Sequence, residues 1–168
     1  RYRVEHYAVE PLPANAVVEK NIAEVEEVGD AVRRAVKSSG AKAKHAAVAV
    51  AGSAVITKVI TMQADLDDDV MESQIQVEAG QYIPYPLEEV NLDFEVRGQA
   101  AGGDAGEVEV LLVASRNENV EARVDALSDA GLTAKVMDVD SYALENAFEL
   151  IRPSLGGESN QTVALIDI

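Results

Sequence analysis

Residues 45–51, His-Ala-Ala-Val-Ala-Val-Ala, form a short run of small apolar residues that ends at Gly52. The run does not alternate with polar residues, so a strand at this place would be covered on both faces. Strands of this kind are typical of parallel sheets with helices packed against them. The run therefore predicts an α/β fold.

The residues before this run predict a strand and a helix. Residues 2–10 alternate imperfectly between apolar and polar side chains, which predicts a strand that Pro11 ends. From residue 18 to residue 37, apolar side chains recur at steps of three and four, and Ser38-Ser39-Gly40 follows as a stop signal. Residues 1–53 therefore predict a strand–helix–strand unit.

The middle of the chain predicts a different arrangement. The patterns of hydrophobic residues predict strands, and helices between them, in the order β-α-β-β-α-β over residues 54–139. This order is that of the ferredoxin-like fold, a four-stranded antiparallel sheet with two helices on one face. The strands are expected at 54–62, 90–96, 107–114 and 133–139.

The end of the chain predicts a return to the first unit. A helix capped by Asp138 or Asp140 and a loop rich in Gly and Ser lead to a last strand over residues 163–168. The sequence thus predicts a discontinuous α/β subdomain, residues 1–53 and 139–168, with a ferredoxin-like subdomain inserted over residues 54–138. Both chain ends lie inside strand-like patterns, so we expect a piece of a longer protein.

Composition excludes several classes of function. The 168 residues include 30 Asp and Glu against 14 Lys and Arg, a net charge of −16. Such a chain repels phosphate backbones and anionic lipid, so we expect no nucleic acid partner and no direct membrane contact. The absence of cysteine excludes disulfides, cysteine-ligated zinc and thiol catalysis.

Other chemistry-bearing residues do not form a convincing site in the sequence. His6 and His45 lie far apart without further ligands at metal-binding spacing, so no metal site is predicted. The acidic cluster 65–69 lacks the glycine and distal glutamate of a calcium loop and is better explained as a helix N-terminus. The loop 102–106 is rich in glycine but has no lysine, and it is predicted to join two strands of a hairpin.

Four local stretches carry a resemblance to a known family. They are Ala-Ala-Val-Ala-Val-Ala-Gly-Ser-Ala-Val-Ile-Thr-Lys (46–58), Glu-Ala-Gly-Gln-Tyr-Ile-Pro-Tyr-Pro (78–86), Glu-Glu-Val-Asn-Leu-Asp-Phe (88–94) and Leu-Thr-Ala-Lys-Val-Met-Asp-Val (132–139). The chain resembles the PilM family, cytoplasmic components of type IV pilus assembly within the FtsA-like branch of the actin-like ATPases. The resemblance implies an actin-like lobe with an inserted subdomain. The alternative is a filament-forming, FtsA-like cell-division ATPase.

The resemblance also implies a nucleotide site in the intact protein. Family members bind ATP and Mg²⁺ between two lobes, and Asp167 matches the carboxylate near the magnesium. The first phosphate loop and the adenosine-binding half have no counterpart in this chain, and the second phosphate loop begins only at its last residues. We therefore expect neither ATP binding nor activity from this chain alone. Whether the intact protein hydrolyses ATP is left open.

A peptide partner is the further implication of the resemblance. It implies binding of the N-terminal cytoplasmic peptide of PilN, a single-pass inner-membrane protein, beside other pilus assembly components. The expected location is the cytoplasmic face of the inner membrane, reached only through the partner, with roles in pilus biogenesis and twitching motility; self-association is left open. A groove between the subdomains would bury the peptide's apolar anchors, and the acidic surface favours flanking basic residues. Its expected lining is Gly52, Ser53, Val55, Tyr142, Tyr82 and Tyr85.

Overall fold

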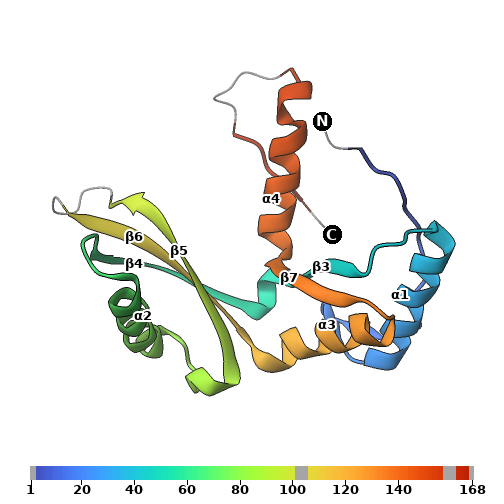
Figure 1. The fold of residues 1–168 in the computed structure, drawn as a ribbon, viewed down its shortest axis with the longest axis horizontal. Coiled ribbons are helices and arrows are strands. Elements are labelled where there is room, and N and C mark those ends of the chain that lie inside the picture. Colours follow the sequence, from blue (N-terminus) through green and yellow to red (C-terminus); the bar gives the residue numbers. More distant parts are fainter. Residues whose placement is uncertain (1–2, 101–105, 157–161, 167–168) are drawn as a thin grey trace. The chain divides into compact units, whose positions relative to one another are not determined.

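The computed structural model describes residues 3–100, 106–156 and 162–166. The chain divides into two compact units, one formed by Arg1–Ser53 with Ala122–Ile168 and the other by Ala54–Glu121. The boundary between Glu121 and Ala122 falls inside a single helix, α3 (Asn117–Asp129). Figure 1 labels the elements of both units.

The first unit is built on a parallel pair of strands. β3 (His45–Val50) pairs with β7 (Thr133–Val139), in a register that runs from His45 opposite Thr133 to Val50 opposite Val139. This pairing confirms the predicted parallel strand. The predicted burial of the whole strand is wrong: Val50 is 3% exposed, but Ala46, Val48 and Ala49 are only half-buried, and His45 and Ala47 are exposed. Among the described residues, β7 is the one strand that pairs with β3.

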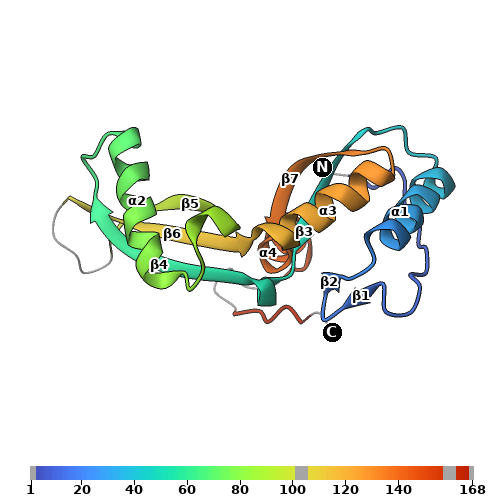
Figure 2. The same cartoon turned by 90° about the horizontal axis from the view of Figure 1, so that it is seen from below.

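Three helices belong wholly or partly to this unit: α1 (Val25–Ser39), α3 and α4 (Asp140–Ile151). α1 ends at Gly40, whose φ of 71° places it in the left-handed conformation that favours glycine. α1 lies beside α3 (Figure 2), and the Nε of Arg33 donates to the carbonyl of Asp129 at 3.1 Å. In the described part of the chain, no helix is long and apolar enough to cross a bilayer.

A small hairpin replaces the first turns of the predicted helix. β1 (Val17–Val18) and β2 (Asn21–Ile22) pair antiparallel, and α1 starts only at Val25. The turn between the strands places Glu19 and Lys20 in the left-handed region, with φ values of 50° and 64°. The prediction from residue 18 failed because the hairpin also packs Ile22 against the apolar cluster of Ala16, Val28 and Ala126. Helical spacing of the apolar residues was therefore compatible with two local structures.

The second unit is a three-stranded antiparallel sheet in the order β4-β6-β5. Its strands are β4 (Val55–Gln63), β5 (Val90–Gln99) and β6 (Glu107–Arg116), with the short turn η2 (Leu87–Glu89) before β5. α2 (Asp68–Tyr82) covers one face of the sheet (Figure 1). The buried core between helix and sheet consists of Ile60, Met62, Met71, Ile75, Ala79, Ile83, Val110, Leu112 and Ala114.

The predicted four-stranded ferredoxin-like sheet is not formed. Its expected fourth strand, Thr133–Val139, is β7, which pairs with β3 of the first unit. The pattern of hydrophobic residues identified the strand correctly, but such a pattern does not specify which sheet a strand joins. The order of the three observed strands is that of a ferredoxin-like sheet without the strand beside β4. The predicted loop 102–106 lies mostly outside the described residues.

The strands predicted at the two ends of the chain are also absent from the described residues. Residues 3–10 are extended without pairing, and Val4, Tyr7 and Val9 are 81%, 80% and 83% exposed. Residues 162–166 are likewise unpaired. A strand is completed by hydrogen bonds to a neighbour, and no described strand lies against either segment.

Replacing Gly29 by alanine tests the packing of α1 on α3. A Cβ at Gly29 would lie 2.8 Å from the Cβ of Asp129 and 3.1 Å from the carbonyl oxygen of Ala126, so the helices would have to separate. We expect Gly29→Ala to lower the free energy of unfolding by about 1–3 kcal/mol in urea denaturation. Gly80→Ala is the matched control, because that helical site is open, and it should stabilise by about 0.5–1 kcal/mol. Equal effects of the two substitutions would contradict this packing.

Candidate functional site

The C-terminal edge of the β3–β7 pair brings together the residues of the candidate site in the first unit. Gly52 follows β3, and Asp140 follows β7 at the start of α4. The Oδ1 of Asp140 accepts hydrogen bonds from the amides of Gly52 at 2.8 Å and Ser141 at 2.7 Å. A Cβ at residue 52 would lie 3.1 Å from this same oxygen, so glycine allows the close approach. In open α/β sheets, this edge is where ligands bind.

The second carboxylate oxygen of Asp140 faces a cation. The Nζ of Lys20 lies 3.8 Å from Oδ2, with the two side chains 52% and 36% exposed. Because both groups are accessible to water, this ion pair contributes little to stability. The ion pair does, however, place a lysine from the β1–β2 turn beside the carboxylate at the sheet edge.

A buried arginine ties the same turn to the sheet. Arg123 of α3 is 6% exposed; its Nε donates to the carbonyl of Ala49 at 2.7 Å, and its Nη2 to the carbonyl of Lys20 at 2.9 Å. Burial lowers the pKa of the Arg123 guanidinium, and the charge of Asp140 partly offsets this effect. Arg123 is therefore a positioning residue for the edge at which Asp140 lies.

The sequence analysis missed the roles of Lys20, Arg123 and Asp140. It treated Asp140 as a helix cap at the junction of the two predicted subdomains. A signal for Arg123 was present, because it lies between Val120 and Leu127 at helical spacing, inside the apolar stripe of α3. A single charge on such a stripe indicates a buried group that needs acceptors. Lys20 carries no comparable signal, since its position depends on the unpredicted hairpin.

The described residues provide no metal centre of their own. No three His, Cys, Asp or Glu side chains among them are grouped so that they could hold a metal ion. The amide of Gly52, which would otherwise be free to face a phosphate, donates to Asp140. Asp167, the predicted carboxylate near magnesium, lies outside the described residues.

Three of the predicted peptide-binding residues belong to the first unit. Gly52 and Ser53 lie in the turn η1 (Gly52–Ala54), where Gly52 is half-buried and Ser53 is exposed. Tyr142 is half-buried in the first turn of α4. The hydroxyl oxygen of Ser141, the residue before it, would lie 3.4 Å from a Cβ at residue 52. The structure therefore brings the Gly52 turn and the start of α4 together.

The other three predicted residues belong to the second unit. Val55 begins β4 and is half-buried, whereas Tyr82 at the end of α2 and Tyr85 after it are 41% and 38% exposed. The Nζ of Lys58 lies 4.8 Å from the ring centroid of Tyr82, and the Cζ of Arg116 lies 5.1 Å from that of Tyr85. Both rings therefore make cation–π contacts and still present surface to water.

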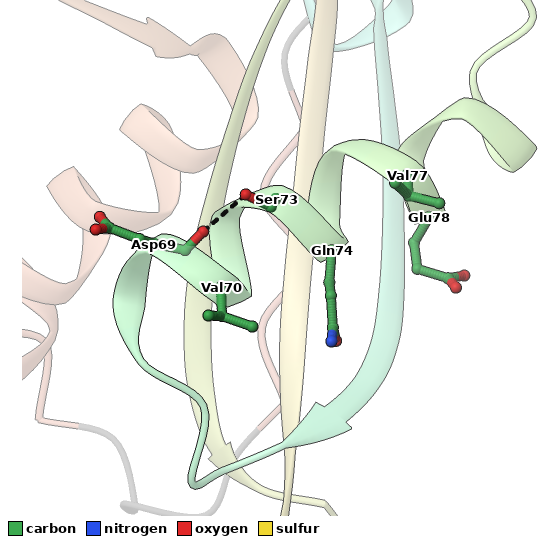
Figure 3. Close-up of a pocket in the computed structure, with 6 residues that line it drawn as sticks. All are labelled: Asp69, Val70, Ser73, Gln74, Val77 and Glu78. Atoms are coloured by element: carbon green, nitrogen blue, oxygen red, sulfur yellow. Dashed lines mark hydrogen bonds between the residues drawn. The ribbon is translucent and has the colours of Figure 1, made fainter.

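A shallow hollow runs along α2 (Figure 3), with a volume of about 510 Å³. All of its lining residues come from this one helix, and Val77 among them is 71% exposed. The Oγ of Ser73 donates to the carbonyl of Asp69 at 2.9 Å, so this hydroxyl is satisfied within the helix. The hollow is helix surface without converging polar groups. Its lining is Asp69, Val70, Ser73, Gln74, Val77 and Glu78.

Replacing Asp140 tests whether its carboxylate holds the edge together. Asp140→Ala leaves the amide of Gly52 without its acceptor, and we expect the free energy of unfolding to fall by about 1–3 kcal/mol. Asp140→Asn keeps an oxygen at the same place and should cost less. Amide hydrogen exchange at Gly52 provides the site-specific measurement, with faster exchange in the alanine variant only. Unchanged exchange in both variants would show that this hydrogen bond does not hold the edge.

Comparisons with known proteins agree with this fold. A chain from the PilM-PilN type IV pilus biogenesis complex is similar with a TM-score of 0.73 and 28% identity, over 83% of this chain and 41% of that chain. The cytoplasmic domain of EpsL, an inner membrane component of the type II secretion system of Vibrio cholerae, reaches only a TM-score of 0.47. That likeness, at 18% identity over 66% of this chain and 42% of the other, carries no structural argument.

The chain thus spans less than half the length of the pilus protein that it matches. Its own sequence is matched from end to end by one family model, described as type IV pilus assembly protein PilM. The resemblance predicted from the four local stretches is confirmed. Because the match covers residues 1–168, the chain belongs to the PilM family of type IV pilus assembly proteins.

Proposed function

We propose that this chain is the part of a pilus assembly scaffold that binds the N-terminal cytoplasmic peptide of PilN. The observation that supports this most directly is the likeness to a chain of the PilM-PilN complex, at 28% identity and a TM-score of 0.73. Family membership favours this role over the filament-forming cell-division alternative. PilN would recruit the protein to the cytoplasmic face of the inner membrane.

The side chains proposed to contact the peptide suit apolar anchors flanked by basic residues. Tyr82 and Tyr85 present accessible aromatic faces, Tyr142 is half-buried, and Ser53 is exposed. Val55 and the backbone of Gly52 complete the proposed set. Aromatic faces bury apolar anchors of an extended segment, while the net charge of −16 attracts cationic residues during encounter.

ATP binding by the complete protein is a separate proposal that rests on the family alone. It places Asp167 near the magnesium ion, where a carboxylate suits a hard cation. A nucleotide-dependent rise in melting temperature of the complete protein, absent from the 168-residue chain, would support it. No shift in the complete protein would contradict it.

Calorimetric titration with a synthetic PilN N-terminal peptide tests peptide binding. We expect saturable one-to-one binding that weakens with added salt, because screening reduces the attraction between the acidic chain and a basic peptide. Tyr85→Ala and Tyr142→Ala should each raise the dissociation constant by about tenfold, as expected for aromatic anchors.

Tyr7→Ala is the matched control for these substitutions. Tyr7 is 80% exposed and lies in the unpaired N-terminal segment, outside the proposed set, so its loss should leave the affinity unchanged. Absence of binding by a folded chain would refute the peptide-binding role. Equal weakening by all three tyrosine variants would refute the assigned residues.

A further inference from the structure

Positive charge gathers at one end of the first unit, although the chain as a whole is acidic. Residues 31–64 contain no Asp or Glu, and neither do residues 130–137. These two stretches include the second half of α1, all of β3 and the start of β7. Five of the 14 Lys and Arg residues lie between residues 33 and 44, and Lys135 lies in the second stretch. Charge is therefore distributed more unevenly than the net value of −16 suggests.

The fold brings the two stretches together where the parallel strands begin. The amide of Thr133, the first residue of β7, donates to the carbonyl of Lys44 at 2.8 Å. The Nε of Arg33, one helical turn before Lys37, donates to the carbonyl of Asp129 at the end of α3. Figures 1 and 2 both show the ends of α1 and α3 and the starts of β3 and β7 on the same side of this unit.

The arginines and the lysines of this region differ in what they contact. Arg33 pairs with Asp30, and the Nε of Arg34 lies 3.5 Å from a carboxylate oxygen of Glu10, so both guanidinium groups have partners within the fold. The lysines are all exposed, and in the part of the chain that the structure describes none of them makes a side-chain hydrogen bond or ion pair. These residues, named the lysine end, are Lys37, Lys42, Lys44 and Lys135.

Ammonium groups without bound partners suit a diffuse anionic surface. Protein interfaces are enriched in arginine and depleted in lysine, because the planar guanidinium forms oriented pairs with carboxylates. Clusters of about four to eight basic residues attract anionic lipid headgroups instead, and this attraction falls off within a Debye length of about 8 Å. Because the range is short, the local charge of the surface that touches a bilayer matters more than the net charge of the chain. The lysine end therefore fits a bilayer surface better than a protein surface.

We propose that the lysine end lies against anionic phospholipid headgroups of the membrane at which PilN holds the protein. This inference rests on the proposed function, because attraction by a few lysines is weak until a bound partner raises the local concentration. The acidic remainder of the molecule is repelled by the same lipid, so the contact is confined to this end. The lysine end and the residues Gly52 and Asp140 lie at opposite ends of the β3–β7 pair, about 15–20 Å apart along the strands. The headgroup contact therefore uses none of the residues proposed to bind the peptide.

A fluorophore at position 43 tests the contact, because the chain contains no cysteine of its own. Ala43→Cys places an environment-sensitive dye at an exposed position between Lys42 and Lys44. A C-terminal hexahistidine tag tethers the chain to nickel-chelating lipid, so that the result does not depend on PilN. We expect a blue shift on vesicles of phosphatidylglycerol and phosphatidylcholine, and none on vesicles of phosphatidylcholine alone. The dye at Gln76→Cys, exposed on α2, is the control and should not shift on either.

Cosedimentation with vesicles that display a lipid-anchored PilN peptide measures what the lysines contribute to binding. Lys42→Gln combined with Lys44→Gln should weaken binding to the anionic vesicles by about tenfold or more, since each lysine contributes about fivefold. Arg97→Gln combined with Arg152→Gln removes the same charge elsewhere and should leave this binding nearly unchanged. Titration with the soluble PilN peptide should give nearly the same affinity for both double variants and the natural chain.

Three results would overturn the proposal. They are a dye at position 43 that does not respond to phosphatidylglycerol, equal binding of the natural chain to anionic and neutral peptide vesicles, and equal losses in the two double variants. The first result would leave an acidic protein segment as the partner of the lysine end. A chain that does not bind the soluble peptide but keeps the dye shift would refute the peptide-binding role alone, so the two failures are distinguishable.

Discussion

The guanidinium of Arg123 is the constraint on which the first unit depends. A buried arginine keeps its charge, so it needs acceptors wherever the fold places it. Here the acceptors are the carbonyls of Ala49 and Lys20, and Asp140 supplies the opposite charge. One side chain of α3 therefore fixes a strand, a turn and the surroundings of a carboxylate. Removing it would take a charged donor away from both carbonyls.

This anchoring explains a turn that the sequence does not favour. Glu19 and Lys20 both adopt left-handed backbone conformations, at a cost of about 1–2 kcal/mol per residue. Neither position holds a glycine or an asparagine, which would reduce that cost. The hydrogen bond from Arg123 to the carbonyl of Lys20 offsets part of this cost, because the guanidinium is buried and charged. The strain thus lies beside the C-terminal edge of β3 and β7, as it often does near functional residues.

The sequence predicted helices and strands correctly where the pattern of hydrophobic residues was compatible with only one secondary structure. The spacing of hydrophobic residues predicted α2, and their alternation with polar residues predicted β4, β5 and β6. All four elements are present in the structure. The apolar residues from Val18 to Ile22 fitted a helix and a hairpin equally well, because both bring Ile22 onto the same cluster. Gly52 was predicted as a site residue from its place at the junction of the two predicted subdomains. Its partner Asp140 required knowledge of which strand β7 joins.

The placement of β7 determines the sheets of both units. By pairing with β3, it brings Asp140 to the amide of Gly52 and creates the edge in the first unit. By not pairing with β4, it leaves the sheet of the second unit with an unprotected strand. Long-range strand pairing is the part of a fold that local patterns specify least, because two sheets can accept the same alternating strand. The choice that the sequence could not predict is therefore the choice that brings Gly52 and Asp140 together.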